Sequence, residues 1–184
     1  MLLSVVGVLA VPIALAGAFG GLRAQPSSPA RATVGSTVDQ GLFNVQILDA
    51  RAGRIKRHTF DPATNMLIVR MRVTDLGDRT FGMSSFLGGI AAESKPGTYV
   101  AADSMRSDGD IEGNATSSIH PRLPLVVQVV WPLPDNAAPR TVTIALRKWE
   151  YGQSFTTDTF YWSVTKQSPI TTKVAVPVHT GVTS

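Results

Sequence analysis

The 184-residue chain contains no cysteine. This absence excludes a disulfide, a thiolate metal site, a cysteine nucleophile and a lipid-modified N-terminal cysteine. It does not identify the compartment, because chains without cysteine suit both oxidising and reducing surroundings. A membrane tether, if the chain has one, must therefore be something other than a lipid-attached cysteine.

Residues for catalysis and cofactor binding are also scarce. None of the three histidines, His58, His120 and His179, has a metal-ligand partner at the short spacing typical of zinc sites. Residues 82–85 do not form the G-x-S-x-G frame of a serine hydrolase, and Gly88-Gly89 lacks the Lys-Ser/Thr of a phosphate-binding loop. No pair of carboxylates is indicated either. We therefore expect no enzymatic activity, no cofactor and no metal.

Charge is low and slightly positive. Only 16% of the residues are charged, and 17 Lys and Arg against 13 Asp and Glu give a net charge of +4. No long amphipathic helix is visible, whereas 16 glycines and 12 prolines favour short strands joined by tight turns. Without its apolar leader the chain is about 150 residues long, the usual size of one domain.

The N-terminus holds the longest apolar run. Residues 2–22 contain no charged side chain, and this length is enough for a helix to cross a bilayer. The run is interpreted as a transmembrane anchor or as a secretory signal, since Ala16-Gly17-Ala18 has the small-x-small form of a cleavage site. We expect a membrane-anchored extracytoplasmic domain, or a secreted one if the leader is cleaved. Residues 23–38 then form a linker with a candidate edge strand.

Residues 65–78 give the clearest strand. Apolar and mostly polar residues alternate, which is typical of a half-buried antiparallel strand. Arg70 and Arg72 lie on the polar face and must meet solvent or a partner, because an unpaired buried guanidinium is costly. The apolar face consists of Leu67, Val69, Met71 and Val73.

Similar alternation recurs along residues 39–184. Strands are predicted at 43–47, 123–131, 142–149, 160–164 and 171–178. With turn signals between them, they predict an all-β domain, a two-sheet antiparallel immunoglobulin-like sandwich of about seven strands. A small β-barrel is the alternative.

A family resemblance accompanies this pattern. The strand that runs into 73–78 (VTDLGD), the loop-rich middle and the strand that ends at 132–134 (PLP) resemble the telokin-like, immunoglobulin-like extracytoplasmic domains of Gram-positive membrane-anchored proteins. The resemblance covers about residues 40–165. It departs from the family at Asp75, where asparagine is usual, and in the missing lipid-attached cysteine. It implies a non-catalytic accessory or adhesion-like module with its tether in the N-terminal helix.

The densest basic cluster lies at residues 51–58, which are predicted to form a loop. Arg51, Arg54, Lys56 and Arg57 are candidate contacts for anionic head groups, and a solvated hairpin tip is the other interpretation. Aromatic residues are not interleaved with these cations, as they are in single-stranded nucleic-acid grooves. We therefore expect no nucleic-acid partner.

The middle of the chain, residues 80–118, predicts loops with a short strand near 98–101. Oxygen-bearing side chains alternate there, from Asp108 to Asn114, as at the start of a calcium loop. The position of the final bidentate glutamate is Ile119, so a plain polar loop is favoured.

Two function hypotheses follow. The first is an accessory or scaffold domain that binds other membrane or envelope proteins, with Arg70 and Arg72 as candidate contacts. The second is a module that binds an envelope glycan or another anionic polymer through Trp149, Tyr151 and Trp162. The alternative for these aromatic residues is that they belong to the core.

Overall fold

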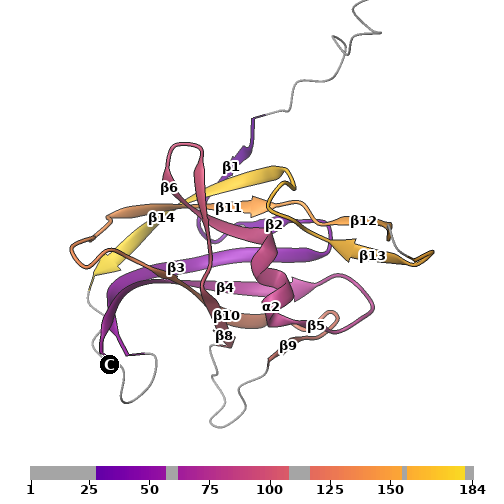
Figure 1. The fold of residues 1–184 in the computed structure, drawn as a ribbon, viewed down its shortest axis with the longest axis horizontal. Coiled ribbons are helices and arrows are strands. Elements are labelled where there is room, and N and C mark those ends of the chain that lie inside the picture. Colours follow the sequence, from indigo (N-terminus) through magenta and orange to yellow (C-terminus); the bar gives the residue numbers. More distant parts are fainter. Residues whose placement is uncertain (1–27, 57–61, 108–116, 155–156, 181–184) are drawn as a thin grey trace, which may run out of the picture.

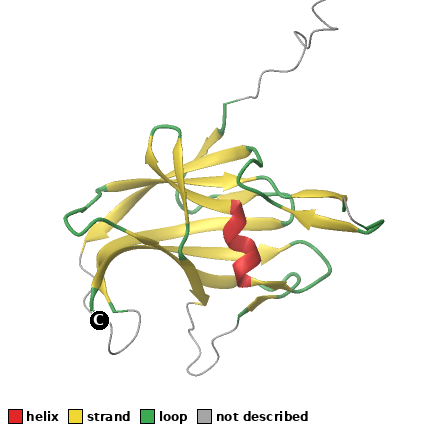
Figure 2. Ribbon diagram, in the orientation of Figure 1, coloured by secondary structure: helices red, strands yellow, loops and turns green. Residues whose placement is uncertain are grey.

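The computed structural model describes residues 28–56, 62–107, 117–154 and 157–180. Strands dominate these residues, which contain one short helix, α2, and one 3-10 turn, η1 (Figure 2). The elements are β1 (Ala30–Ala32), β2 (Thr37–Asp39), β3 (Phe43–Ile55), β4 (Thr64–Asp75), β5 (Phe81–Gly82), α2 (Met83–Phe86), η1 (Leu87–Gly89), β6 (Ile90–Lys95), β7 (Thr98–Ala101), β8 (Ser104–Ser107), β9 (Ser118–Ile119), β10 (Leu125–Pro132), β11 (Thr141–Arg147), β12 (Glu150–Gln153), β13 (Phe160–Ser163) and β14 (Ile170–Thr180).

The strands form a β-sandwich in which one strand joins the two layers. The first layer has the order β7-β6-β11-β14, and the second has the order β14-β3-β4-β10-β8 (Figure 1). The first part of β14, from Ile170 to Pro177, pairs antiparallel with β11, whereas its last residues, from Val178, pair parallel with β3 at Ala50–Ala52. The two layers are therefore one large curled sheet.

The prediction of a purely antiparallel sandwich with about seven strands is wrong in part. β1 and β3 both pair parallel with β14, so the sheet is mixed, and the described residues contain several short strands in addition to those expected. The reason is that β14 is long enough to pair on different edges along its length, which period-two alternation does not reveal. Within the described residues the strand order is open, from β7 to β8, so it is not a closed barrel.

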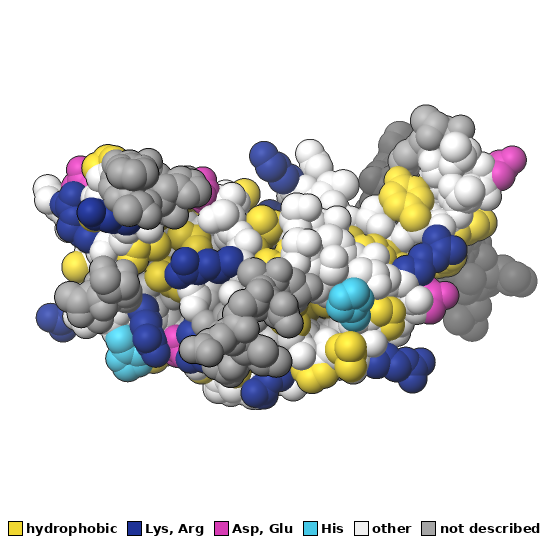
Figure 3. Space-filling model, turned by 90° about the horizontal axis from the view of Figure 1, so that it is seen from below, with side chains coloured by type: hydrophobic (Ala, Val, Ile, Leu, Met, Phe, Trp, Pro, Cys, Tyr) yellow, Lys and Arg dark blue, Asp and Glu magenta, His cyan; other side chains and the backbone are white. Residues whose placement is uncertain are grey.

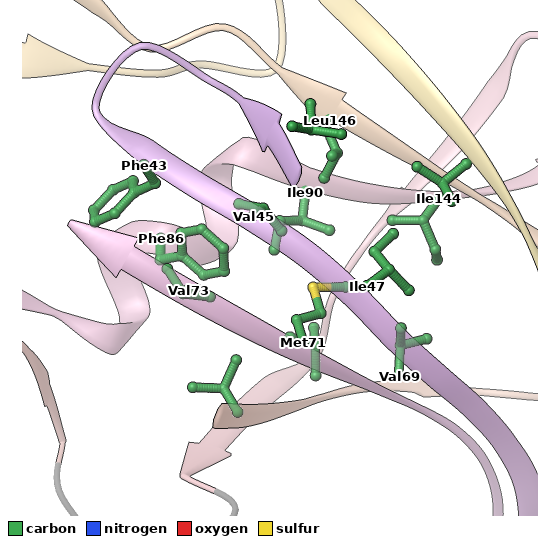
Figure 4. Close-up of a cluster of buried hydrophobic side chains, with 14 of the residues drawn as sticks. Phe43, Val45, Ile47, Val69, Met71, Val73, Phe86, Ile90, Ile144 and Leu146 are labelled. Carbon is green, nitrogen blue, oxygen red and sulfur yellow. The ribbon is translucent and has the colours of Figure 1, made fainter. Parts of the chain in front are cut away.

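The core fills the space between the layers. Alternating residues of β3 and β4 point inward, as predicted, and meet residues from β6, β11 and β14 (Figure 4). At one end Phe43 is fully buried and makes edge-to-face contacts with Phe81, Phe86 and Trp149, at centroid distances of 5.2–5.7 Å. This aromatic group connects β3 to α2 and to the end of β11.

The basic segment, residues 51–58, was predicted to be a loop, but its part up to Ile55 is a strand. It continues β3, and its pairing with β4 extends to Ile55 and Thr64. A β-bulge at Leu48 shifts the register by one residue, so that Ala50 and Ala52 become the buried positions. The small side chains of Ala50 and Ala52 gave no strong apolar signal, which explains the wrong prediction.

The middle of the chain contains more structure than predicted. Residues 80–107 form β5, α2, η1 and β6–β8, and β6 is a core strand with Ile90, Ala91 and Ala92 all buried. Three consecutive buried residues show no alternation, so sequence periodicity did not mark this strand. The oxygen-rich stretch from Asp108 to Asn114 lies outside the described residues.

The predicted membrane segment, residues 2–22, also lies outside the described residues. In the described part of the chain, no helix has the length and hydrophobicity needed to cross a bilayer.

The turn after β4 contains a buried carboxyl group. Asp75 is fully buried; its Oδ1 accepts a hydrogen bond from the Gly77 backbone N–H at 2.7 Å, while Oδ2 has no partner within the described residues. Desolvation by burial raises the pKa of Asp75 above its ordinary value of 3.8, and the nearby Asp78 raises it further, although the bond from Gly77 opposes this shift. The ionised carboxylate is therefore a cost to the folded state.

We expect Asp75→Asn to stabilise the domain at pH 7 by about 1 kcal/mol or more, because it removes an unsatisfied buried charge. Since the pKa is raised in the folded state, wild-type stability falls as the pH rises from about 3.8 through the raised pKa. The advantage of the variant should therefore vanish at low pH. Urea unfolding between pH 3 and pH 8 measures this. An advantage that persists unchanged at low pH would contradict it, and Asp135→Asn serves as the exposed control.

Candidate functional site

The strands β12 and β13 form a hairpin that projects from one end of the sandwich (Figure 1). In its register Tyr151 lies opposite Trp162, and Gln153 lies opposite Phe160. Because side chains alternate between the faces of a strand, Tyr151, Phe160 and Trp162 share one face. Aromatic residues also favour strands, which explains why this segment is extended.

The three rings form one contiguous aromatic surface. The Tyr151 ring stacks with that of Phe160 at 5.8 Å and 27°, and it lies 5.4 Å from the Trp162 ring at 52°. Tyr151 is 60% exposed and Phe160 is 55% exposed, whereas Trp162 is half-buried. Side chains of this size usually bury most of their area, so a cluster of exposed rings indicates a contact surface. Hydrophobic side chains are visible at this end of the molecule in Figure 3.

The rings form one wall of a cleft, and the segment after β4 forms the other. The cleft has a volume of about 320 Å³ and is lined by residues 77–81 together with Tyr151 and residues 160–162. The second wall is polar, with the side chains of Asp78, Arg79 and Thr80 all exposed. Thr80 Oγ1 also lies 3.0 Å from Nδ1 of His120, which ties this wall to the segment before β10. We call this site the aromatic cleft.

A second hollow adjoins the hairpin. It has a volume of about 600 Å³, and its lining includes Lys148, Glu150, Gly152 and Tyr161. Gly152 lies opposite Tyr161 in the hairpin, and a Cβ added to it would meet no atom within 4 Å. Because glycine has no side chain, the face of the Tyr161 ring is left open, and Tyr161 is 47% exposed.

The base of the hairpin is held firmly. The Trp149 backbone N–H donates to the Gln40 carbonyl at 2.7 Å, and Gln40 Nε2 donates to the carbonyls of Gly89 and Arg147. Gly41 lies in the left-handed region at φ +96, where a Cβ would approach the Trp149 carbonyl oxygen to 2.8 Å and Trp162 Cζ3 to 3.4 Å. A close approach of this kind requires glycine. The position of the aromatic surface is thus set by the core.

Sequence reasoning located this site in part. The predicted Tyr151 and Trp162 lie together in the aromatic cleft, but Trp149 is only 3% exposed and belongs to the core. Trp149 lies between β11 and β12, where its ring packs edge to face against those of Phe43 and Phe81, which accounts for its burial. Phe160 was missed, although the alternation in Phe160–Ser163 places it on the same face as Trp162. The polar wall was also missed, since about 70 residues separate it from the hairpin along the chain.

The predicted arginine contacts lie elsewhere. Arg70 and Arg72 are on β4 and do not line the aromatic cleft; Arg70 Nη1 donates to Asp49 Oδ2 at 2.9 Å, and Arg72 Nη1 donates to Gln46 Oε1 at 2.8 Å. The basic cluster is split by the alternation along β3. Arg51 and Arg54 are on opposite faces, Lys56 follows the strand, and Arg57 lies outside the described residues.

The described part of the chain has no group of three or more His, Asp and Glu side chains arranged to hold a metal ion. The chemistry that the aromatic cleft offers is therefore stacking on the rings and hydrogen bonding to the hydroxyl, carboxylate and guanidinium groups of the facing wall.

No family model matches the chain, and no curated protein matches it. Among solved structures, it is similar to an uncharacterized β-sandwich protein from Clostridium difficile 630, with 13% identity and a TM-score of 0.49 over 84% of this chain and 97% of that one. It is also similar to the yjhA protein from Bacillus subtilis, with 11% identity and a TM-score of 0.39 over 73% of this chain and 98% of that one. Neither similarity assigns a function to this chain.

Proposed function

We propose that this domain is a non-catalytic binding module that holds a glycan in the aromatic cleft. The observation that carries the proposal is the pairing of an exposed aromatic wall, Tyr151 with Phe160 and Trp162, with a polar wall at residues 78–80. A sugar ring has an apolar C–H face that stacks on aromatic rings and a rim of hydroxyls that hydrogen-bond to polar side chains. Mixed walls of this kind are usual in small-molecule sites.

The size and charge of the cleft restrict the class of ligand that it can hold. A volume of about 320 Å³ is at the lower end of the range for ligand sites, roughly 300–1,000 Å³, which suits one or two sugar rings. Asp78 and Arg79 carry opposite charges at neighbouring positions of the polar wall. This balance favours neutral sugars over strongly charged ones at this site.

We further propose that this module acts in the cell envelope, as the apolar run at residues 2–22 suggests. In this proposal residues 2–22 tether the domain to a membrane, or direct its secretion, and the domain is extracytoplasmic. The telokin-like, immunoglobulin-like resemblance of residues 40–165 is compatible with an accessory module that has no catalytic residues.

A second candidate function is the binding of an envelope protein. Two large apolar side chains favour it: Leu76 is 42% exposed and Leu123 is 62% exposed. Leu76 and Leu123 each follow a residue of one backbone hydrogen bond, in which the Arg122 N–H donates to the Asp75 carbonyl at 2.8 Å. Co-purification of a stoichiometric protein from mildly solubilised native membranes, lost on Leu123→Asp, would support this function; recovery of the chain alone would count against it.

Tryptophan fluorescence tests the glycan proposal. Trp131 and Trp149 are buried, so Trp162 is the tryptophan that reports on the aromatic cleft. We expect neutral oligosaccharides to change the emission of the wild type, and Phe160→Ala to weaken their binding about tenfold, a loss of about 1.4 kcal/mol.

Two control variants test whether the signal comes from Trp162 and whether binding occurs in the aromatic cleft. Trp162→Phe should abolish the fluorescence change while calorimetry still detects binding, and Leu123→Ala, which truncates an exposed side chain outside the cleft, should leave the affinity unchanged. An absence of binding by calorimetry across neutral and acidic oligosaccharides would refute the proposal.

A further inference from the structure

The outer face of the second layer gathers arginines from three strands that are distant in the sequence. Alternation along β3 and β4 places Arg51, Arg70 and Arg72 on the face that points away from the core, and pairing with β10 brings Arg106 of β8 to the same face. The only carboxylate on this face within the described residues of these strands is that of Asp49. We call these four arginines the arginine face.

Each arginine is held by a hydrogen-bond acceptor or an ion pair, across neighbouring strands for Arg70, Arg72 and Arg106 and within β3 for Arg51. Arg72 Nη1 donates to Gln46 Oε1 at 2.8 Å, and Arg106 Nε donates to Gln128 Oε1 at 2.9 Å. Asp49 is shared, with Arg70 at 2.9 Å and Arg51 at 3.6 Å. A guanidinium has five donors, so the single bonds to Gln46 and Gln128 orient the groups and leave further donors for a ligand. Because glutamine is neutral, Gln46 and Gln128 orient the two guanidinium groups without neutralising their positive charge.

The spacing of the charges suits a repeating anion. Arg70 and Arg72 are two residues apart on one strand, about 7 Å, and Arg106 is two strands from Arg70, about 10 Å. Arginine binds phosphate oxygens in a bidentate manner with high geometric specificity. Phosphates that recur along an extended chain could therefore engage successive guanidinium groups on this surface.

We propose that the arginine face is a binding surface for a linear phosphate-bearing polyanion, a site separate from the aromatic cleft. Arg51, Arg72 and Arg106 are exposed and supply the ligand contacts, while Arg70 is held by Asp49 and shapes the surface. Lys and Arg side chains are spread over the side of the molecule seen in Figure 3. This surface is independent of the proposed glycan function.

An anionic membrane fits this surface less well than a polymer does. The described chain begins next to β1, which lies at the top of Figure 1, whereas β8 and β10 lie at the bottom. β1 pairs with β14 of the first layer, and β8 is the far edge of the second layer. Arg106 of the arginine face is therefore at the sheet edge remote from the start of the described chain, so a tether at the N-terminus does not by itself bring this residue to a membrane.

The test is the binding of inorganic polyphosphate to the full-length protein, measured by calorimetry from about 50 to about 200 mM salt. When binding depends on phosphate contacts, the logarithm of the binding constant falls linearly with the logarithm of the salt concentration, because binding releases counterions. We expect Arg72→Gln with Arg106→Gln to weaken binding at least tenfold at the lowest salt and to reduce the salt slope by about 1.5, since each lost contact contributes roughly 0.7–0.9.

A charge-matched control is available in the same chain. Arg54→Gln with Lys56→Gln also removes two positive charges, but Arg54 projects from the other face of β3. This control should retain most of the affinity and the salt slope. Equal losses in the two double variants would overturn the proposal, as would no binding of polyphosphate by the wild type, or binding to phosphatidylglycerol vesicles but not to polyphosphate. Thermal unfolding of both variants establishes that they remain folded.

Discussion

Phe43→Ala is expected to lower the free energy of unfolding by about 3–5 kcal/mol, the range for truncating a fully buried phenylalanine. Phe43 has no exposed area, and its ring contacts those of Phe81, Phe86 and Trp149 edge to face. Truncation leaves a cavity between β3, α2 and the end of β11, and the aromatic contacts add about 0.5–1.5 kcal/mol per pair beyond the loss of buried area. Urea unfolding of purified protein measures the loss.

Two variants calibrate this loss. Phe43→Leu keeps most of the apolar volume and should cost clearly less than Phe43→Ala. Phe160→Ala removes the same side chain from the exposed hairpin, where Phe160 is 55% exposed, and should change the stability by less than about 1 kcal/mol. Equal losses at positions 43 and 160 would contradict the complete burial of Phe43 among these rings.

Gly41→Ala is the second substitution with a large expected effect, a loss of about 3 kcal/mol or more. The left-handed conformation at φ +96 costs an alanine about 1–2 kcal/mol by itself. The new Cβ would also lie 2.8 Å from the Trp149 carbonyl oxygen, a backbone atom that cannot rotate away. Relief of this clash requires the chain to move at the base of the β12–β13 hairpin.

Gly35 provides a matched control for this prediction. It has a similar φ of +85, but a Cβ added there would meet no atom within 4 Å. Gly35→Ala should therefore cost only the conformational term, about 1–2 kcal/mol, and the difference between the two variants isolates the clash. If both variants lose the same stability in urea unfolding, the close approach of Gly41 to Trp149 is not real.

Because Gly41 lies against Trp162 of the hairpin, Gly41→Ala has a second expected consequence. Trp162 Cζ3 lies 3.4 Å from the position of the new Cβ, so the substitution is expected to displace the Trp162 ring, which lines the aromatic cleft. If the cleft holds a glycan, this variant should bind it more weakly than Gly35→Ala at temperatures where both are folded. A shared loss of stability alone would not produce that difference.

Much of the β architecture was predictable from sequence because alternation is a local property. Leu67, Val69, Met71 and Val73 of β4 are buried as predicted, and the strands β10, β11 and β14 lie where the apolar periodicity placed them. The pairing of Tyr151 and Trp162 also follows locally, since a short connection in a hairpin brings the two strands together.

Other features depended on contacts between residues that are far apart in the sequence. The bulge at Leu48 places Arg51 on the outer face, whereas unbroken alternation from Phe43 would have turned it inward, and neither a bulge nor its register leaves a periodic signal. The burial of Trp149, the core position of β6 and the double pairing of β14 likewise reflect how the layers close over each other.

The sequence by itself therefore determined the β class, the positions of the alternating strands and the concentration of aromatic residues near the C-terminus. Only the tertiary structure decided which side chains meet: residues 78–80 with the hairpin rings, and Arg106 with Arg70 and Arg72. The physical reason is that alternation selects the buried face of each strand locally, whereas strand order and register follow from the burial and hydrogen bonding of the whole sheet.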